Sequence, residues 1–373
     1  MSAQPNVLMI ARWFPPTTGG IERYLEMLYA GLAQSRAVTI VTPKGQNGLP
    51  GRLYRICEAP VRARWGTGSK RPILSLGWVT VLEARTARVI CAGHILTGAA
   101  AVLAGFLWRR PVVIHCYGLE LANGRLLTLK SATLRRATLV VSISEYTTEL
   151  LLSLGVDQRK IVLIPPGVDT ETFTDGPKLS GTERTRFLTV SRLDSNSRYK
   201  GHDMVAAALG ELKRQGEKFE WRIVGEGSDR KYIEGLVLAN DLQADVKLLG
   251  LVDARALVEE YQRADVLVMP NREGEFGASE GFGMVFTEAQ ACGTPVIAGL
   301  AGGTGAAVED GLGGRRIDGT DVGSVRETLR DVIHDPVRWA RMGERGQAWV
   351  RNNHGWPARV GDLGAAIDRV CGL

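Results

Sequence analysis

Short apolar segments rich in β-branched residues alternate with segments of helical character along this chain, and this alternation constrains the fold more than any single motif. In the first half, five such apolar segments occur, at residues 7–11, 38–41, 89–91, 112–115 and 139–143. Residues 21–33, which follow the first segment, repeat their apolar side chains at helical spacing. Continuously apolar strands that are separated by helices are typical of a parallel sheet covered on both faces.

The same pattern starts again after a polar stretch at 165–185 that is rich in Pro, Gly and Thr. Five further apolar segments follow it, at 187–190, 221–224, 246–248, 266–269 and 295–298. The sequence therefore predicts an α/β chain of two doubly wound, Rossmann-like domains that face each other across a cleft. A length of 373 residues accommodates two such domains.

The composition changes suggest where these domains begin and end. We expect an N-terminal domain at 1–170, a linker at 171–184 and a C-terminal domain at 185–355, with a helix at 356–373 that packs back on the N-terminal domain. Residues 89–108 are nearly uncharged and just long enough to span a bilayer. Because this segment contains a histidine and many small residues, we predict a buried strand followed by a buried helix instead.

The cysteines and the first residues indicate a cellular compartment. The five cysteines are widely spaced and form no Cys-x-x-Cys pair, so we expect neither a disulfide framework nor a zinc site. The first residues lack the basic and then apolar layout of a signal peptide. We therefore expect a cytoplasmic protein, with peripheral attachment at the inner membrane face as an alternative.

Basic charge is concentrated in the first part of the chain. Residues 1–170 contain twenty Lys and Arg against nine Asp and Glu, whereas the remainder has twenty-six against thirty-one. Residues 52–71 combine six cations with Tyr54 and Trp65, and a second cluster lies at residues 130–136. Such segments suit an anionic acceptor, an anionic membrane surface or an acidic carrier protein, although a solvated basic loop is a plainer explanation. We expect no nucleic-acid partner.

The segment 273–299 carries the strongest functional signal, because two glutamates flank a predicted helix start. Glu280 and Glu288 have seven residues between them, and Gly283 opens the helix that holds Glu288. The first amide groups of a helix have no partner inside it, which makes them a site for a diphosphate. Here they belong to Gly283, Met284 and Val285. Glu280 is then placed for sugar hydroxyls and Glu288 for ribose hydroxyls. A plainer alternative is a carboxylate that favours the helix dipole, together with a surface glutamate.

Cations and glycines elsewhere in the second half extend this interpretation. Arg192 follows a predicted strand and Lys200 comes eight residues later. Two cations at one sheet edge would oppose the charge on a departing nucleotide diphosphate, although such loop residues are often simply solvated. The turn Gly225-Glu226-Gly227 lets the backbone approach a nucleotide closely. The backbone at Leu251, in a similar turn, is placed to meet a base edge.

Taken in order along the chain, these landmarks resemble those of the retaining family 4 glycosyltransferases of the GT-B fold. The pair Gly19-Gly20 in the first strand–helix loop, His115 after a later strand, and residues 166–169 complete the pattern. The resemblance covers nearly the whole chain. Within the family, three segments are most similar to the phosphatidylinositol mannosyltransferases and their relatives. These segments are residues 93–101, 143–147 and 280–299.

The resemblance implies a transferase that moves a hexose or an N-acetylhexosamine from a UDP- or GDP-sugar to a hydroxyl or amine, with retained anomeric configuration. Arg192 and Lys200 would hold the diphosphate, Glu280 would contact the donor sugar and Glu288 would bind the ribose. Further donor contacts would come from Gly20, Gly225, Gly227, Leu251, Gly283, Met284 and Val285. Attack from the front face, with the departing phosphate accepting the proton, would make Glu280 a positioning group.

The resemblance implies less about the acceptor. His115 would lie near the C6 hydroxyl of the sugar and the reaction centre, whereas outside the family we would expect a buried, hydrogen-bonded histidine at a strand end. Gly19, Tyr117 and Glu120 would lie on the acceptor side. The family usually has an acidic residue or glycine soon after this histidine, and Cys116 and Tyr117 intervene here. The acceptor classes left open are a lipid headgroup, a small metabolite, free or on a carrier protein, and a growing polysaccharide.

The sequence also bears on metal binding and on other possible functions. The sequence contains no Asp-x-Asp, so we expect no metal and no cofactor besides the nucleotide-sugar co-substrate. A nucleotide-sugar 2-epimerase shares the predicted architecture but needs grouped histidines, and the five histidines here are scattered. A dehydrogenase would need Gly-x-Gly-x-x-Gly after the first strand. A non-catalytic protein that binds a nucleotide sugar stays a further alternative.

Overall fold

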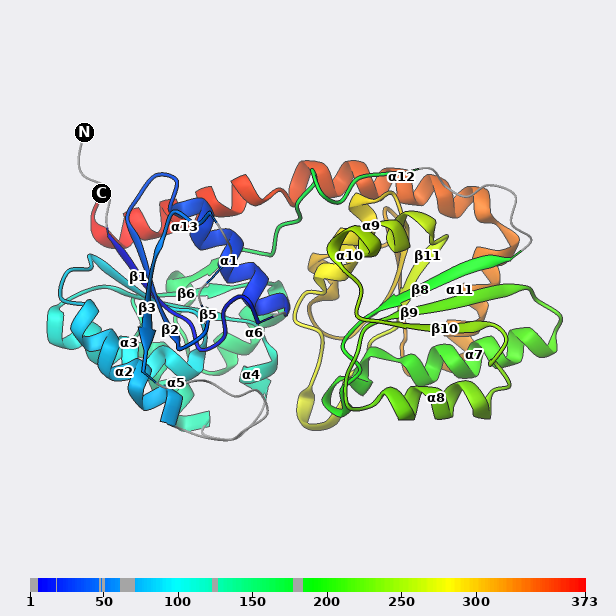
Figure 1. The fold of residues 1–373 in the computed structure, drawn as a ribbon, viewed down its shortest axis with the longest axis horizontal. Coiled ribbons are helices and arrows are strands. Elements are labelled where there is room, and N and C mark those ends of the chain that lie inside the picture. Colours follow the sequence, from blue (N-terminus) through cyan, green and yellow to red (C-terminus); the bar gives the residue numbers. More distant parts are fainter. Residues whose placement is uncertain are drawn as a thin grey trace. The chain divides into compact units, whose positions relative to one another are not determined.

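The computed structural model divides into two compact units, one formed by Met1–Pro166 with Trp356–Leu373 and the other by Gly167–Gly355 (Figure 1). The structure describes residues 6–17, 19–46, 48, 51–60, 71–122, 127–176 and 184–373. Residues 61–70 of the basic segment, including Trp65, and residues 177–183 of the predicted linker lie outside the described residues.

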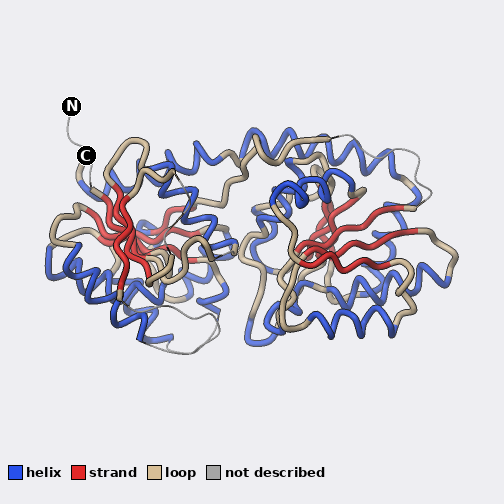
Figure 2. The backbone as a smooth tube through the Cα atoms, in the orientation of Figure 1, coloured by secondary structure: helices blue, strands red, loops and turns tan. Residues whose placement is uncertain are grey.

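Within the described residues, the first unit contains a seven-stranded sheet in the order β3-β2-β1-β4-β5-β6-β7. The strands are β1 Val7–Ile10, β2 Val38–Pro43, β3 Arg55–Ala59, β4 Val89–Ala92, β5 Val112–Cys116, β6 Leu139–Ser142 and β7 Ile161–Leu163. All neighbouring strands are parallel, and Met9 lies opposite both Ile40 and Cys91. The central strands are buried because helices cover both faces, as Figure 2 shows.

The helices of the first unit form two layers. They are α1 Gly20–Leu32, α2 Arg71–Glu83, α3 Ile95–Trp108, α4 Leu119–Ala122, α5 Leu127–Arg136, α6 Glu145–Ser153, α13 Trp356–Cys371 and the 3₁₀ turn η1 Gln158–Lys160. Side chains of α2, α3 and α5 pack into one core with the strands. On the other face, α13 lies along α1 so closely that a Cβ on Gly31 would come 2.4 Å from Val360. Arg36 pairs with Asp368 at 2.9 Å and fastens this layer.

Residues 89–108 form β4 and α3, which confirms the prediction of a strand followed by a helix. The prediction that this helix is buried is wrong for its outer face, where Leu103, Phe106 and Leu107 are exposed. Only the stripe that faces the sheet is buried, and it contains small residues such as Ala101 and Ala104. Among the helices that the structure describes, none is long and apolar enough to cross a membrane.

The second unit contains, within the described residues, a six-stranded parallel sheet in the order β10-β9-β8-β11-β12-β13. The strands are β8 Thr185–Val190, β9 Phe219–Val224, β10 Val246–Gly250, β11 Val266–Met269, β12 Val296–Gly299 and β13 Gly314–Ile317. Phe187, Phe219 and Trp221 form its core together with Trp339. The two parallel sheets with flanking helices confirm the predicted fold class.

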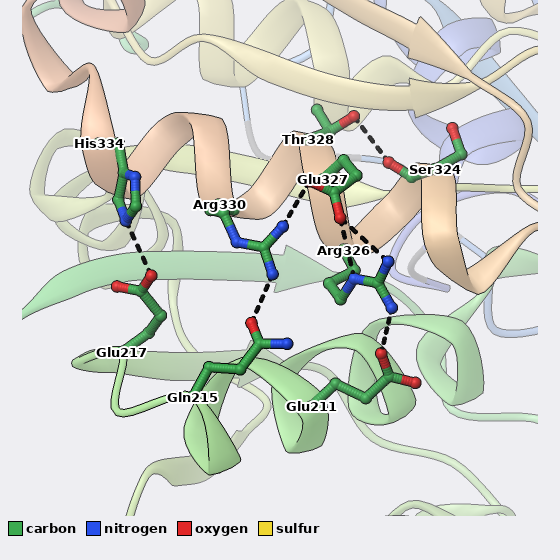
Figure 3. A network of polar contacts seen from close by, with 9 residues as sticks. All are labelled: Glu211, Gln215, Glu217, Ser324, Arg326, Glu327, Thr328, Arg330 and His334. Atoms are coloured by element: carbon green, nitrogen blue, oxygen red, sulfur yellow. Dashed lines mark hydrogen bonds and ion pairs between the residues drawn. The ribbon is translucent and has the colours of Figure 1, made fainter.

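Helices surround the second sheet on both faces as well (Figure 1). They are α7 His202–Arg214, α8 Arg230–Ala239, α9 Ala254–Arg263, α10 Met284–Ala291, α11 Val322–His334, α12 Pro336–Asn353 and the 3₁₀ turns η2 Ser195–Lys200, η3 Glu275–Gly277 and η4 Gly302–Ala306. A row of polar contacts ties α11 to α7 and the turn after it, far from the carboxyl ends of the strands (Figure 3). The contacts join Arg326 to Glu211, Arg330 to Gln215 and His334 to Glu217.

Candidate functional site

The carboxyl ends of β8 and β11 bring together two of the predicted charged residues. Lys200 ends η2, directly after β8, and Glu280 lies in the loop between β11 and α10. The Lys200 ammonium donates to Glu280 Oε2 at 2.7 Å, and the two side chains are only 13% and 15% exposed. Burial acts to lower the pKa of Lys200, but the Glu280 carboxylate and Tyr199 together outweigh it and the pKa is raised. The site therefore holds a charged lysine neutralised by one carboxylate.

The backbone of Glu280 is fixed by η4. The Gly303 amide donates to the Glu280 carbonyl at 2.7 Å. Gly302 has a φ of 74° and approaches so closely that a Cβ there would lie 2.3 Å from the same carbonyl. The buried Asn271 side chain bridges the loops by accepting from the Gly299 amide at 3.0 Å and donating to Ala301. Close backbone packing thus fixes the main chain of Glu280, from which the carboxylate reaches Lys200.

Arg192 is exposed in the loop after β8, between the buried residues Ser191 and Leu193. Its charge is one of the influences that lower the pKa of Lys200, so the two cations are near neighbours. Beneath this loop, Ser191 Oγ and His202 Nε2 are 2.9 Å apart, and burial lowers the pKa of His202 to about 4. Sequence reasoning missed this support, because a Ser and a His eleven residues apart follow no recognisable pattern.

The N-terminus of α10 presents unpaired amide groups. Gly283 caps the helix with a φ of 89°, and a Cβ there would lie 2.5 Å from the Phe286 ring. The Phe286 amide donates to the Gly283 carbonyl at 2.9 Å. The amides of Gly283, Met284 and Val285 make no hydrogen bond to any part of the chain that the structure describes. Three open donors at a helix N-terminus next to a lysine can hold an anion.

Glu288 points inward one turn further along α10. Its side chain is buried, and the Tyr261 hydroxyl, which α9 supplies, donates to Oε2 at 2.9 Å. Tyr261 is fully buried and packs edge-on against Phe173 with 6.0 Å between ring centroids. Tyr261 therefore orients the carboxylate that the sequence assigns to the ribose. Its position, 27 residues before Glu288, gave no signal in the sequence.

The glycine turn after β9 has a structural explanation that the sequence did not show. A Cβ on Gly225 would lie 1.8 Å from the Ser191 carbonyl, and one on Gly227 would lie 2.2 Å from the Leu193 carbonyl. Both glycines are thus required by close packing of neighbouring loops, without any ligand. Leu251 follows β10 directly, and its side chain is 79% exposed.

His115, the candidate catalytic residue of the first unit, is fully buried at the end of β5. Its Nε2 lies 2.9 Å from the Tyr29 hydroxyl, and Tyr24 packs edge-on against the ring. Nδ1 is buried and has no partner within the described residues, and burial lowers the pKa to about 3. In this structure α1 supplies the tyrosine side chains that cover the ring. The position of His115 near the donor sugar stays a prediction.

The predicted acceptor residues lie at the carboxyl edge of the first sheet. The Tyr117 hydroxyl donates to the Gly93 carbonyl at 2.8 Å, and the Tyr117 amide donates to Glu120 Oε1 at 2.7 Å. Gly19 caps α1 with Gly20 as the first helical residue, and a Cβ on Gly19 would lie 2.3 Å from the Glu22 carboxylate. The Glu22 carboxylate is the end of a flexible side chain that can move, and the φ of Gly19 is 172°, so the fold of α1 does not by itself require glycine at residue 19.

Three residues that we did not predict border this edge. His94 stacks on Tyr117 with 6.0 Å between centroids and caps α3 by accepting from the Leu96 amide at 3.1 Å. Trp13 packs edge-on against His94, and the Arg12 guanidinium lies 4.5 Å from the Trp13 ring centroid. Burial, together with the charge of Arg12, lowers the pKa of His94 to about 3. The sequence did offer one signal for these three residues, because they come shortly after the predicted buried strands.

The basic segments are less uniform than the sequence suggested. Tyr54, which we counted among the surface aromatics, is buried, and its hydroxyl donates to Glu26 at 2.6 Å. The Lys130 ammonium donates to the Glu120 carbonyl at 2.7 Å. Arg135 and Arg136 are exposed. Among the described residues of these segments, Tyr54 and Lys130 are thus engaged within the fold, whereas Arg135 and Arg136 are open to a partner.

Comparisons with known proteins decide the family. Residues 19–167 match the glycosyl transferase 4-like domain, and residues 172–349 match the glycosyl transferases group 1 model. The chain is 34% identical, over 95% of its length and 96% of the relative, to a GDP-mannose-dependent alpha-(1-6)-phosphatidylinositol monomannoside mannosyltransferase of Mycolicibacterium smegmatis. The chain belongs to the group 1 glycosyl transferases. It is therefore a glycosyltransferase, which decides against the epimerase and the non-catalytic binding protein.

Further relatives support the same assignment. The Mycobacterium tuberculosis H37Rv protein of the same name is 30% identical over 96% of this chain and 97% of the relative. A D-inositol 3-phosphate glycosyltransferase of Xylanimonas cellulosilytica is 28% identical over 83% of this chain and 75% of the relative. The fold matches a sucrose-phosphate synthase from Thermosynechococcus elongatus with a TM-score of 0.85 at 20% identity, covering 99% and 100% of the two chains. The two parallel-sheet domains and this structural match give the chain the GT-B fold.

Proposed function

We propose that this glycosyltransferase uses GDP-mannose as its donor and an inositol-bearing phospholipid, of the phosphatidylinositol mannoside class, as its acceptor. The relatives that are at least 30% identical and cover almost the whole chain carry these substrates in their names. The 28% identical inositol phosphate glycosyltransferase shares an inositol acceptor with them. An inositol ring is thus the common acceptor chemistry.

We further propose that the anomeric configuration is retained. GDP-mannose carries its mannose in the α configuration, and the names of these relatives specify an alpha-(1-6) linkage. In the proposed step, the acceptor oxygen bonds to the anomeric carbon from the side of the departing diphosphate. The bond between that carbon and the phosphate oxygen breaks, and the acceptor's proton passes to the departing phosphate.

The observation that carries this proposal is the grouping of a charged lysine, a carboxylate and open helix amides in the second unit. Lys200, with Arg192 beside it, would stabilise negative charge on the departing GDP. The amides of Gly283, Met284 and Val285 would donate to the same diphosphate. Glu280, now paired with Lys200 at 2.7 Å, would exchange this contact for sugar hydroxyls. We propose on these grounds that the transfer needs neither a metal nor a cofactor.

A donor screen followed by a transfer assay tests the proposal. GDP should raise the melting temperature more than UDP, ADP or dTDP, because a nucleotide at a hundredfold excess over its Kd stabilises the fold by about 2.7 kcal/mol. Transfer of mannose to a phosphatidylinositol monomannoside, with an α linkage and undiminished rate in EDTA, is expected.

The alternative acceptor from the comparisons is a free inositol phosphate, which the same assay includes. Preferential transfer to that compound would assign free inositol phosphate as the acceptor in place of the lipid, and it would leave the assignment of the donor unchanged. A larger rise in melting temperature with UDP than with GDP, together with sugar transfer from a UDP-sugar only, would overturn the assignment of GDP-mannose as the donor. A product with inverted configuration, or loss of transfer in EDTA, would overturn the corresponding part of the mechanism.

A further inference from the structure

The outer surface of α2, α3 and α5 is strongly apolar. The three helices lie side by side on one face of the first sheet (Figure 1). The exposed fractions of their outward side chains are 70% for Trp78, 57% for Leu82, 54% for Leu103, 81% for Phe106, 52% for Leu107 and 56% for Leu129. We refer to these six residues as the outer apolar face.

These residues are continuous across the helices. A Cβ on Gly77 of α2 would touch Ala100 of α3 at 3.6 Å, so the two helices pack closely. The Trp108 indole, at the end of α3, donates to the Val81 carbonyl of α2 at 2.8 Å. Between α3 and α5 lies an open hollow of about 340 Å³, which Leu103, Phe106 and Leu129 line. The outer apolar face is therefore one surface and not a set of scattered side chains, which marks it as an interaction site.

The charges that border α3 and α5 are basic, and the one acid at the end of α2, Glu83, is paired with Arg55. Neither α3 nor α5 contains an acidic residue. Arg109 and Arg110 follow α3, and Arg135 and Arg136 end α5. None of the four makes an ion pair with any side chain in the described ranges, and Arg110 Nε is buried without a hydrogen-bond partner. The Arg136 side chain also lines the hollow beside Phe106. An apolar surface is thus edged by positive charge that the fold leaves unneutralised.

We propose that the outer apolar face docks on a lipid bilayer that contains anionic lipids. Its apolar side chains would enter the boundary between headgroups and acyl chains, and the four arginines would meet anionic headgroups. With 14 residues, α3 is too short to span a bilayer and would lie in its plane. Two tryptophans, Trp78 and Trp108, lie on this surface, and this residue type is favoured at membrane interfaces.

A second copy of the chain fits the same surface less well. A symmetric dimer through this face would place the arginines of one copy close to those of the other, with no acidic residue on α3 or α5 to pair with them. The bilayer proposal is independent of which acceptor the enzyme uses, since it rests on this surface alone. A lipid acceptor would add a reason for it.

Co-sedimentation of the full chain with vesicles tests the proposal. We expect binding to vesicles of phosphatidylcholine mixed with phosphatidylglycerol, weaker binding at high salt, and weak binding to phosphatidylcholine alone. The double variant Leu103→Ser/Phe106→Ser should bind mixed vesicles about tenfold more weakly or worse, because two apolar side chains no longer leave water. The variant Arg135→Glu/Arg136→Glu should lose a comparable amount.

Matched controls separate docking from misfolding and from other partners. Leu238→Ser changes a leucine that is 66% exposed on α8 of the second unit, and it should bind like the wild type. Melting temperature and donor-dependent stabilisation should be unchanged in every variant. Failure of the wild type to bind mixed vesicles, or equal binding by the Leu103/Phe106 variant, overturns the proposal. A wild-type dimer in light scattering that this variant converts to monomer assigns the face to a second copy instead.

Discussion

The ion pair between Lys200 and Glu280 allows a quantitative test in the free enzyme. The two side chains are 13% and 15% exposed and 2.7 Å apart, so the pair is far less screened than a surface pair. The pKa of Lys200 is raised although burial acts to lower it, which means that attraction outweighs desolvation. We expect a coupling free energy of about 2 kcal/mol between the two residues, above the ~0.5 kcal/mol of exposed pairs and below the ~3–5 kcal/mol cost of stranding a buried charge.

A double-mutant cycle measures this coupling. Lys200→Met, Glu280→Gln and the double variant are unfolded in denaturant, and their free energies of unfolding are compared with that of the wild type. Lys200→Met should cost about 2–3 kcal/mol because it leaves Glu280 unpaired, and the double variant should cost less than the two single variants added together. The exposed pair Arg255–Glu259, with 3.4 Å between its charged atoms, provides a control cycle in which coupling should stay near ~0.5 kcal/mol.

The same variants connect stability to catalysis. Each single variant should reduce kcat by roughly a hundredfold or more, because a charge or a positioning group next to the departing diphosphate is lost. If the unfolding free-energy losses of the two single variants add up to that of the double variant within about 0.5 kcal/mol, the coupling argument is refuted. Near-normal kcat in Glu280→Gln, with its fold intact, would refute the assignment of Glu280 to the sugar.

Two further predictions concern buried groups. His115 and His94 have folded-state pKa values of about 3 and His202 of about 4, against 6.5 when unfolded. Their contribution to stability is therefore complete above pH 6.5 and is lost as pH falls towards 4, by about 1.4 kcal/mol per histidine per pH unit. Unfolding curves between pH 7.5 and 4.5 should show this loss, and His115→Asn should make it shallower; an equal slope would contradict the burial argument. Tyr261→Phe should weaken nucleotide binding about tenfold, at about 1.5 kcal/mol for a hydrogen bond to a charged group, and change kcat little. Unchanged nucleotide affinity in titration calorimetry would argue against an orienting role towards Glu288.

The sequence predicted the central strands and the edge strand β10, but it missed the edge strands β3 and β13. The predicted segments at 7–11, 112–115 and 266–269 coincide with β1, β5 and β11, which are buried on both faces and are therefore continuously apolar. By contrast, β3 Arg55–Ala59 and β13 Gly314–Ile317 lie at sheet edges and contain arginines on exposed positions. An edge strand that is partly solvated loses the continuous apolar pattern that identifies a buried strand.

The candidate site was predictable where residues lie close together in sequence. Gly283 and Glu288 belong to one helix, so their arrangement follows from helical geometry. The contact between Lys200 and Glu280 joins residues 80 positions apart, and its length and burial depend on how loops pack at the sheet edge. Tyr261 was not predictable for the same reason, since α9 brings it to Glu288 only in the folded unit.

The sequence by itself determined two parallel sheets, the helix that Gly283 caps and the residue types that a nucleotide diphosphate needs. These features follow from local periodicity and from chemistry that residues carry in any context. The tertiary structure alone decided that His115 is enclosed by tyrosines of α1 and that Phe106 is 81% exposed. Whether a side chain is covered depends on which elements pack against its face, and the periodicity of one segment does not contain that information.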